Sequence, residues 1–124
     1  MRKWILAAAV AAWAIPATAQ DVPLRDAVAR DYRDNLGALF DHFHRNPELS
    51  GREVQTSARM AQELRALGYE VHTGVGGHGV VALLVNGEGP TVILRADMDG
   101  LPPQERSGLP NASTVRQADA AGVE

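Results

Sequence analysis

The sequence predicts an α/β fold in which helices cover a small mixed sheet. Two amphipathic stretches predict the helices, because apolar residues recur at helical spacing over residues 24–45 and again over residues 54–67. A short alternating stretch and two apolar runs rich in β-branched residues follow at residues 69–73, 80–85 and 91–96. This order, two helices and then strands, is typical of helices packed on one sheet.

The first helix is expected over about residues 24–45. Its apolar positions fall on one face, and four charged residues lie off that face where they can meet water. The apolar positions are Tyr32, Leu36, Leu39, Phe40 and Phe43, and the charged ones are Asp26, Arg30, Asp34 and Asp41. Asn46-Pro47 should end the helix, because the residue before a proline avoids the α region.

The second helix has a start signal and a stop signal. Ser50-Gly51-Arg52-Glu53 fits a capping box, in which the hydroxyl and the carboxylate bond to each other's free amide groups. Gly68 is suited to the residue just after the last turn. The expected buried face consists of Val54, Ala58, Ala61, Leu64 and Leu67.

Three strands are expected. Residues 69–73 alternate, and a flexible glycine-rich turn follows at residues 74–79. Residues 80–85 are continuously apolar, as in a strand buried on both faces. A turn over residues 86–90 should join them to residues 91–96 as a β-hairpin. Such strands require neighbours, so the sheet is expected to be incomplete. Residues 104–124 are polar and show no core face.

The N-terminus has the design of a secretory signal peptide over residues 1–19. A basic start, Met1-Arg2-Lys3, precedes an apolar stretch over residues 4–15 and then Ala17-Thr18-Ala19. Cleavage after Ala19 would leave a chain beginning at Gln20 or Asp21, exported to the periplasm or secreted. An uncleaved N-terminal anchor is the alternative, although the apolar stretch is short for a membrane span.

Composition excludes several classes of function. Removing Arg2 and Lys3 lowers the formal net charge from −3 to −5, which argues against nucleic acid or an anionic membrane as a partner. The chain has no cysteine, so it has neither disulfides nor a cysteine-based zinc site.

Asp97 and Asp99 are the candidate site residues. They follow an apolar run directly, and the C-terminal tips of buried strands are where α/β proteins place ligands. Two carboxylates this close repel each other unless a cation, a metal or a histidine lies nearby. They are interpreted either as acids that bind or orient a metal or ligand, or as a solvated turn at the strand exit. Arg95 as a local ion-pair partner would favour the turn.

Other chemistry-bearing residues carry weaker signals. His42 and His44 lie two positions apart on a helix and do not share a face. His72 and His78 have no companions at ligand spacing. The glycine-rich stretch 74–79 lacks the Lys-Ser/Thr of a phosphate-binding loop and leads into a strand, so it is interpreted as a turn.

An ordered series of motifs resembles a known enzyme family. The series begins with His44-Arg45-Asn46-Pro47-Glu48-Leu49-Ser50. It continues to Leu94-Arg95-Ala96-Asp97-Met98-Asp99-Gly100-Leu101-Pro102, and ends with Glu105 and Gly108-Leu109-Pro110. The series is similar to the N-terminal part of metal-dependent amidohydrolases that include hippurate hydrolase, N-acyl-amino-acid amidohydrolases and auxin-conjugate hydrolases. These belong to the wider aminoacylase and glutamate-carboxypeptidase-like metallopeptidase family.

The resemblance implies a larger enzyme than this chain. It implies a three-layer zinc-peptidase-like catalytic domain, of which residues 20–124 would be an incomplete piece, and a lid domain that helps the enzyme to form a homodimer. It also implies two divalent metals, zinc or manganese, and substrates that are N-acyl amino acids or small peptides. Asp99 matches the acid that orients the metal site, and Asp97 stands where the wider family has a histidine ligand.

The remaining apparatus is expected outside this sequence. The family branch takes metal ligands from a Cys-Gly-His run, and its general base is a glutamate that has no match here. The chain is therefore interpreted as the exported N-terminal piece of an amidohydrolase, with no metal ligand of its own and inactive in isolation. The alternatives are a non-catalytic exported binding or interaction remnant, and one subunit of a split enzyme.

Overall fold

The computed structural model describes residues 23–118 and 121–122 of the 124-residue chain. The predicted signal peptide over residues 1–19, with its cleavage point, lies outside the described residues. Within the part that is described, no helix has both the length and the apolar character needed to cross a membrane.

The first helix runs from Leu24 to Arg45, as the sequence predicts. It consists of α1 (Leu24–Asp31), a π-helical turn η1 (Tyr32–Leu36) and α2 (Gly37–Arg45), which follow one another without a break. Asn46 closes the helix: its backbone N–H bonds to the carbonyls of His42 and Phe43, and its side-chain amide donates to the His42 carbonyl. The expected stop at Asn46-Pro47 is confirmed.

The apolar stripe of this helix is largely exposed. The prediction that it faces a core is wrong for Tyr32 and Phe40, more than half of whose surfaces meet solvent, whereas Leu39 and Phe43 are half-buried. Leu24 and Val28 extend the exposed stripe toward the N-terminus. The wider π turn compensates for the angular drift of apolar residues spaced four apart, and so keeps the stripe on one side.

The second helix, α3 (Val54–Ala66), begins differently from the prediction. No side chain at its N-cap, Glu53, makes a capping bond, so the expected capping box is wrong. The Glu48 carboxylate caps the helix instead, accepting N–H bonds from Gln55 at 3.0 Å and Thr56 at 2.7 Å. A carboxylate that bonds two free amides at once satisfies more of the helix start than a serine hydroxyl, which bonds one.

The end of α3 matches the prediction. Gly68 adopts a left-handed φ of 86°, and its N–H bonds to the carbonyl of Arg65, while the Tyr69 N–H bonds to that of Leu64. This is the Schellman arrangement that glycine favours after a helix.

The sheet is a two-stranded antiparallel hairpin. Strand β1 (Glu70–Val75) pairs with β2 (Gly79–Leu83) across the glycine-rich turn, with Val71 opposite Ala82 and Thr73 opposite Val80. The register slips at Gly74, whose φ of 77° makes room for a bulge. The strand at 69–73 and the turn after it are thus confirmed, and an α/β fold is confirmed in this coarse sense.

The predicted hairpin between residues 80–85 and 91–96 is wrong. Strand β2 ends at Leu83, and residues 84–97, which we call the arm, form neither helix nor strand. The prediction that residues 80–85 are buried on both faces is also wrong, because Val81 and Leu83 are exposed. A β-prone run becomes a strand only when a partner completes its ladder, and the described residues give the arm none.

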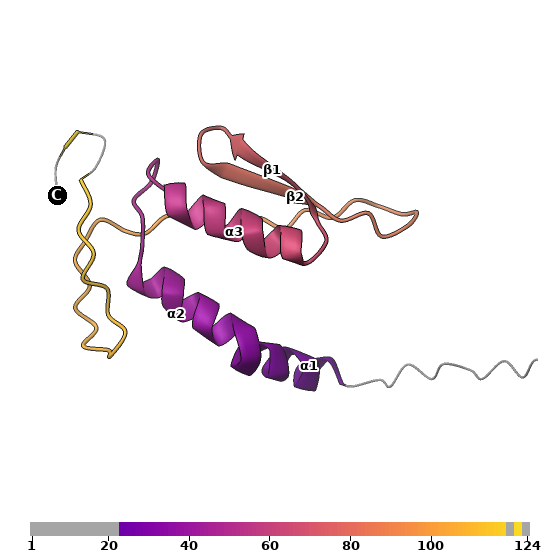
Figure 1. The fold of residues 1–124 in the computed structure, drawn as a ribbon, viewed down its shortest axis with the longest axis horizontal. Coiled ribbons are helices and arrows are strands. Elements are labelled where there is room, and N and C mark those ends of the chain that lie inside the picture. The colour runs from indigo at the N-terminus through magenta and orange to yellow at the C-terminus, as the bar shows by residue number, and fades with distance from the viewer. Residues whose placement is uncertain (1–22, 119–120, 123–124) are drawn as a thin grey trace, which may run out of the picture.

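Helix α3 lies along the hairpin (Figure 1) and supplies most of the small core. Of the described residues, Ala61 and Thr56 are buried, and both are on α3. Ala61 confirms the predicted buried face, but Val54, Ala58 and Leu67 are exposed. The C-terminal segment passes beside the end of α2 instead of joining the hairpin (Figure 1).

Candidate functional site

The two candidate acids lie at the end of the arm and are both exposed. Asp97 accepts a hydrogen bond from Arg95, with 2.8 Å between the Arg95 Nη2 and Asp97 Oδ1 atoms. The local ion pair considered for Arg95 is therefore present, and of the two interpretations it favours the solvated turn. Neither Asp97 nor Asp99 lines the cavity described below, and their role in a site stays a prediction.

The residue after the acids is anchored to the connection between α2 and α3. The Gly100 N–H donates to the Glu48 carbonyl at 2.7 Å, and Gly100 forms a parallel bridge with Leu49. The approach is close, since a Cβ atom at Gly100 would lie 2.7 Å from the Pro47 Cβ atom. This contact holds the residue that follows Asp99 beside the motif at residues 44–50.

The connection between α2 and α3, residues 46–53, is called the corner below. The Glu48 side chain links this corner to the start of α3. Burial raises the pKa of Glu48, but the amide hydrogen bonds from Thr56 and Gln55 outweigh burial and hold it below its ordinary value. The carboxylate therefore stays ionised at neutral pH. An anion at a helix start also interacts favourably with the helix dipole, so Glu48 couples the corner to α3.

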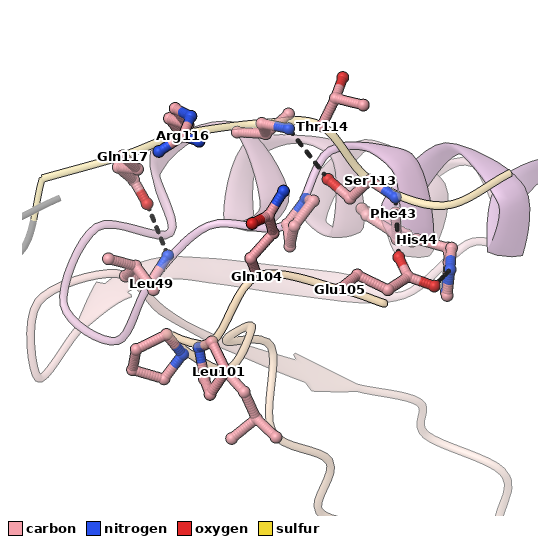
Figure 2. A pocket seen from close by; sticks show the side chains of 14 residues that line it. Phe43, His44, Leu49, Leu101, Gln104, Glu105, Ser113, Thr114, Arg116 and Gln117 are labelled. Atoms are coloured by element: carbon pink, nitrogen blue, oxygen red, sulfur yellow. Dashed lines mark hydrogen bonds and ion pairs between the residues drawn. The ribbon is translucent and has the colours of Figure 1, made fainter. Parts of the chain in front are cut away.

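A second carboxylate, Glu105, joins α2 to the C-terminal segment. His44 Nε2 lies 3.1 Å from Glu105 Oε1, and the Ser107 hydroxyl donates to the same oxygen. The Ser113 N–H donates to Oε2 at 2.7 Å. The Ser107 hydroxyl, the Ser113 amide and His44 lower the pKa of Glu105. Figure 2 shows Glu105 between His44 and Ser113.

Two further bonds attach this segment. The Ser113 hydroxyl donates to the Arg45 carbonyl at 3.0 Å, and the Leu49 N–H donates to the Gln117 side-chain oxygen at 2.6 Å. The irregular chain from Glu105 to Gln117 is thus fastened at both of its ends. The expectation that residues 104–124 lack a core face is consistent with this, because polar bonds do the fastening.

These attachments border an open cavity of about 760 Å³ between the end of α2 and the C-terminal segment. Its walls are mixed: Phe43, Leu49 and Leu101 are apolar, whereas Gln104 and Arg116 are polar (Figure 2). Asp97 and Asp99 do not line it. The fold therefore brings His44 and Glu105 to the cavity but leaves the predicted acids outside it.

The described residues do not fit a divalent metal centre. Across residues 23–118 and 121–122, no three His, Asp or Glu side chains gather where they could hold a metal ion. His44 contacts Glu105, His72 contacts Glu70 at 3.1 Å, and Asp97 contacts Arg95.

The roles of Glu48, Glu105 and Gln117 were not predicted from residue patterns. The contact between His44 and Glu105 joins residues 61 positions apart, and the contact between Leu49 and Gln117 joins residues 68 positions apart. Hydrophobic periodicity reports local structure and carries no signal for such bonds. The only available signal was the motif series, in which His44, Glu48 and Glu105 all occur.

Comparison with known proteins gives partial matches. The chain is 48% identical to the hippurate hydrolase of Campylobacter jejuni over 84 residues, 67% of this chain and 22% of that protein. It is 48% identical to thermostable carboxypeptidase 2 of Saccharolobus solfataricus over 76 residues, 60% of this chain and 19% of that protein. It is 40% identical to the IAA-amino acid hydrolase ILR1-like 5 of Arabidopsis thaliana over 75 residues, 60% of this chain and 17% of that protein.

The matches are strong in identity but short in extent. The chain spans about a fifth of the length of the curated relatives it matches. No family model matches the chain, and no solved structure matches it. Over roughly 60% of its length the chain is thus homologous to amidohydrolases and carboxypeptidases, which confirms the family resemblance for that part of the sequence.

Proposed function

We propose that this chain forms part of an amidohydrolase that cleaves the amide bond of N-acyl amino acids or small peptides. The observation that carries the proposal is the 48% identity to hippurate hydrolase over 84 residues. A second relative, 41% identical over 73 residues, is the N-acetyl-L-cysteine deacetylase of Bacillus subtilis. Hippurate and N-acetyl-L-cysteine are both N-acyl amino acids, so two relatives point to one substrate class.

The proposed site residues are Asp99, as the acid that orients the metal site, and Asp97 beside it. Their exposure supports the proposal, because an acid that is not committed to a core remains available to ligands supplied by other residues. The bond from Gly100 to Glu48 supports it further, since it fixes the position at which the acids leave the corner. In the described structure, Arg95 forms an ion pair with Asp97.

In this proposal the zinc or manganese ions of the complete enzyme are held by residues other than those described. Catalytic zinc usually takes three protein ligands, and the sequence has no cysteine for the expected Cys-Gly-His run. The 124-residue chain alone should therefore not hydrolyse amides. The complete enzyme is proposed to be a homodimer in the periplasm or outside the cell, delivered by the signal peptide at residues 1–19.

The test compares the chain with a longer product. The gene is first sequenced through and beyond the codon for Glu124, and any open frame is expressed with residues 1–124, in one polypeptide or as two. Release of glycine from hippurate is measured with zinc or manganese added. We expect no hydrolysis by the 124-residue chain and hydrolysis by the longer product.

The control in that assay is Asp99→Asn in the longer product. Loss of an acid that orients the site should lower kcat by about 100-fold or more, with the protein still folded. Hydrolysis by the isolated chain would contradict the proposed inactivity. A longer product that folds, binds metal and cleaves none of a panel of N-acyl amino acids would contradict the proposed function.

A further inference from the structure

Glu48 holds two segments of the chain at once, one through its side chain and the other through its backbone. Its two carboxylate oxygens accept the N–H groups of Gln55 and Thr56 at the start of α3. Its backbone carbonyl accepts the Gly100 N–H at 2.7 Å. A single residue therefore joins the start of a helix to a segment far along the chain.

The bond to Gly100 acts on Asp99, because the Gly100 N–H belongs to the peptide unit that joins these two residues. A peptide unit is planar, so a bond that fixes its N–H group also fixes the plane that contains the Asp99 Cα atom. The approach is close as well, since a Cβ atom at Gly100 would lie 2.7 Å from the Pro47 Cβ atom. The corner thus restrains the backbone of Asp99, although Asp99 itself is exposed.

The Glu48 carboxylate holds the corner against α3. Residues 46–53 belong to neither a helix nor a strand, and a charged acceptor bonds an amide more strongly than a neutral one does. Without the carboxylate, the corner stays connected to α3 by the turn at residues 49–52, in which the Arg52 N–H bonds to the Leu49 carbonyl. That turn does not involve the Glu48 carbonyl, so the position of this carbonyl would then depend on fewer bonds.

We propose that Glu48 is a positioning residue for Asp99. Its carboxylate holds the corner on α3, and its carbonyl passes that position on to the peptide unit between Asp99 and Gly100. Both carboxylate oxygens are already bonded to amides, so Glu48 acts by position and not by contact with the substrate. This role rests on the proposed function of Asp99, whereas the restraint of Gly100 can be measured in the 124-residue chain alone.

The first test measures this restraint by amide hydrogen exchange, followed by NMR on the full chain. Glu48→Ala should speed exchange of the Gly100 N–H by about fivefold or more, the size of effect that losing a helix cap has on an equilibrium. The matched control is Ala58→Gly, which weakens the middle of α3 and leaves the bonds of Glu48 in place. The control should change the exchange of Gly100 by less than about twofold.

Faster exchange in Glu48→Ala but not in Ala58→Gly supports the proposal. Equal acceleration in both variants would show that Gly100 responds to the stability of α3 in general, and overturns it. Unchanged exchange in Glu48→Ala overturns it too, because the carboxylate would then not restrain Gly100. Circular dichroism checks that the helices of each variant are formed. If Glu48→Ala does not fold, Glu48→Gln replaces it, because its side-chain oxygen keeps one amide bond and should give intermediate exchange.

The second test uses the longer product and determines whether Glu48 acts through Asp99. Glu48→Ala should lower kcat by about tenfold with KM nearly unchanged, because a misplaced group slows the reaction where binding is intact. In the Asp99→Asn background, the same change should lower kcat by less than about twofold, since no acid is left to position. Equal losses in the two backgrounds overturn the proposal and leave the proposed function standing. A longer product without activity contradicts the proposed function instead, and the exchange experiment then decides whether Glu48 restrains Gly100.

Discussion

The hairpin and the arm are both glycine-linked, β-prone stretches of one chain, but only the hairpin is paired. Strands β1 and β2 pair across the turn at residues 76–78, and helix α3 packs on them with Ala61 at its centre. The arm contains a bend with two glycines at positive φ, Gly87 and Gly89, and then a proline that has no N–H to donate. Both runs are apolar, so the difference between them lies in the residues that surround each run.

This comparison separates propensity from pairing. Val92, Ile93 and Leu94 are as apolar as Val80, Val81 and Leu83, yet they stay unpaired and exposed among the described residues. Strand propensity mainly measures how well a side chain fits a half-buried pleated surface. Where the chain offers no such surface, the same residues remain a single extended segment.

The largest expected effect comes from overfilling the contact between α3 and the hairpin. Ala61 is 1% exposed, so Ala61→Leu should destabilise the fold by about 1–3 kcal/mol through strain against the strands. Ala66→Leu, on the exposed end of the same helix, is the control and should have little effect. Urea unfolding followed by circular dichroism measures both. Equal effects at the two positions would show that α3 is not packed on the hairpin.

Removing the carboxylate that starts α3 should have the next largest effect. Glu48→Ala deletes two amide caps and should cost about 1 kcal/mol. Glu53→Ala, at the position that the capping box implied, should cost much less because no cap bond is lost. The two unfolding midpoints decide between the start observed in the structure and the start that the sequence pattern indicated. A larger loss for Glu53→Ala would restore the capping box.

These residues show how much of the fold the sequence predicted. The helix over residues 24–45, the Schellman end at Gly68, the strand at residues 69–73 and the glycine turn are local features, and local periodicity and turn chemistry predicted them. The partner of β2, the cap of α3 and the position of Glu105 depend on which distant residues meet. For the candidate site, the position after an apolar run and the motif resemblance both pointed to Asp97 and Asp99, whose role stays a prediction, while the cavity beside His44 depends on bonds that no local pattern reports.

Acidification should release the C-terminal segment from α2. The Ser107 and Ser113 bonds and His44 lower the pKa of Glu105 in the folded chain. Its contribution to stability is therefore complete above the ordinary glutamate pKa of about 4.3, and is lost as the pH falls through the lower folded value. The native chain and Glu105→Gln should therefore differ in unfolding midpoint at neutral pH, and this difference should shrink to zero as the pH falls over that range. A difference independent of pH would mean that Glu105 acts without its charge.

The smallest expected effect is on the arm, and it tests the comparison most directly. Leu94 is 96% exposed and touches no core, so Leu94→Ala should change the free energy of unfolding of the dilute chain by less than about 0.5 kcal/mol. A leucine in a packed internal strand loses about 2–5 kcal/mol on the same substitution. Urea unfolding over a dilution series measures this cost in the absence of any association between copies. A large cost that persists on dilution would mean that the arm is packed within its own chain, and the contrast with the hairpin would fail.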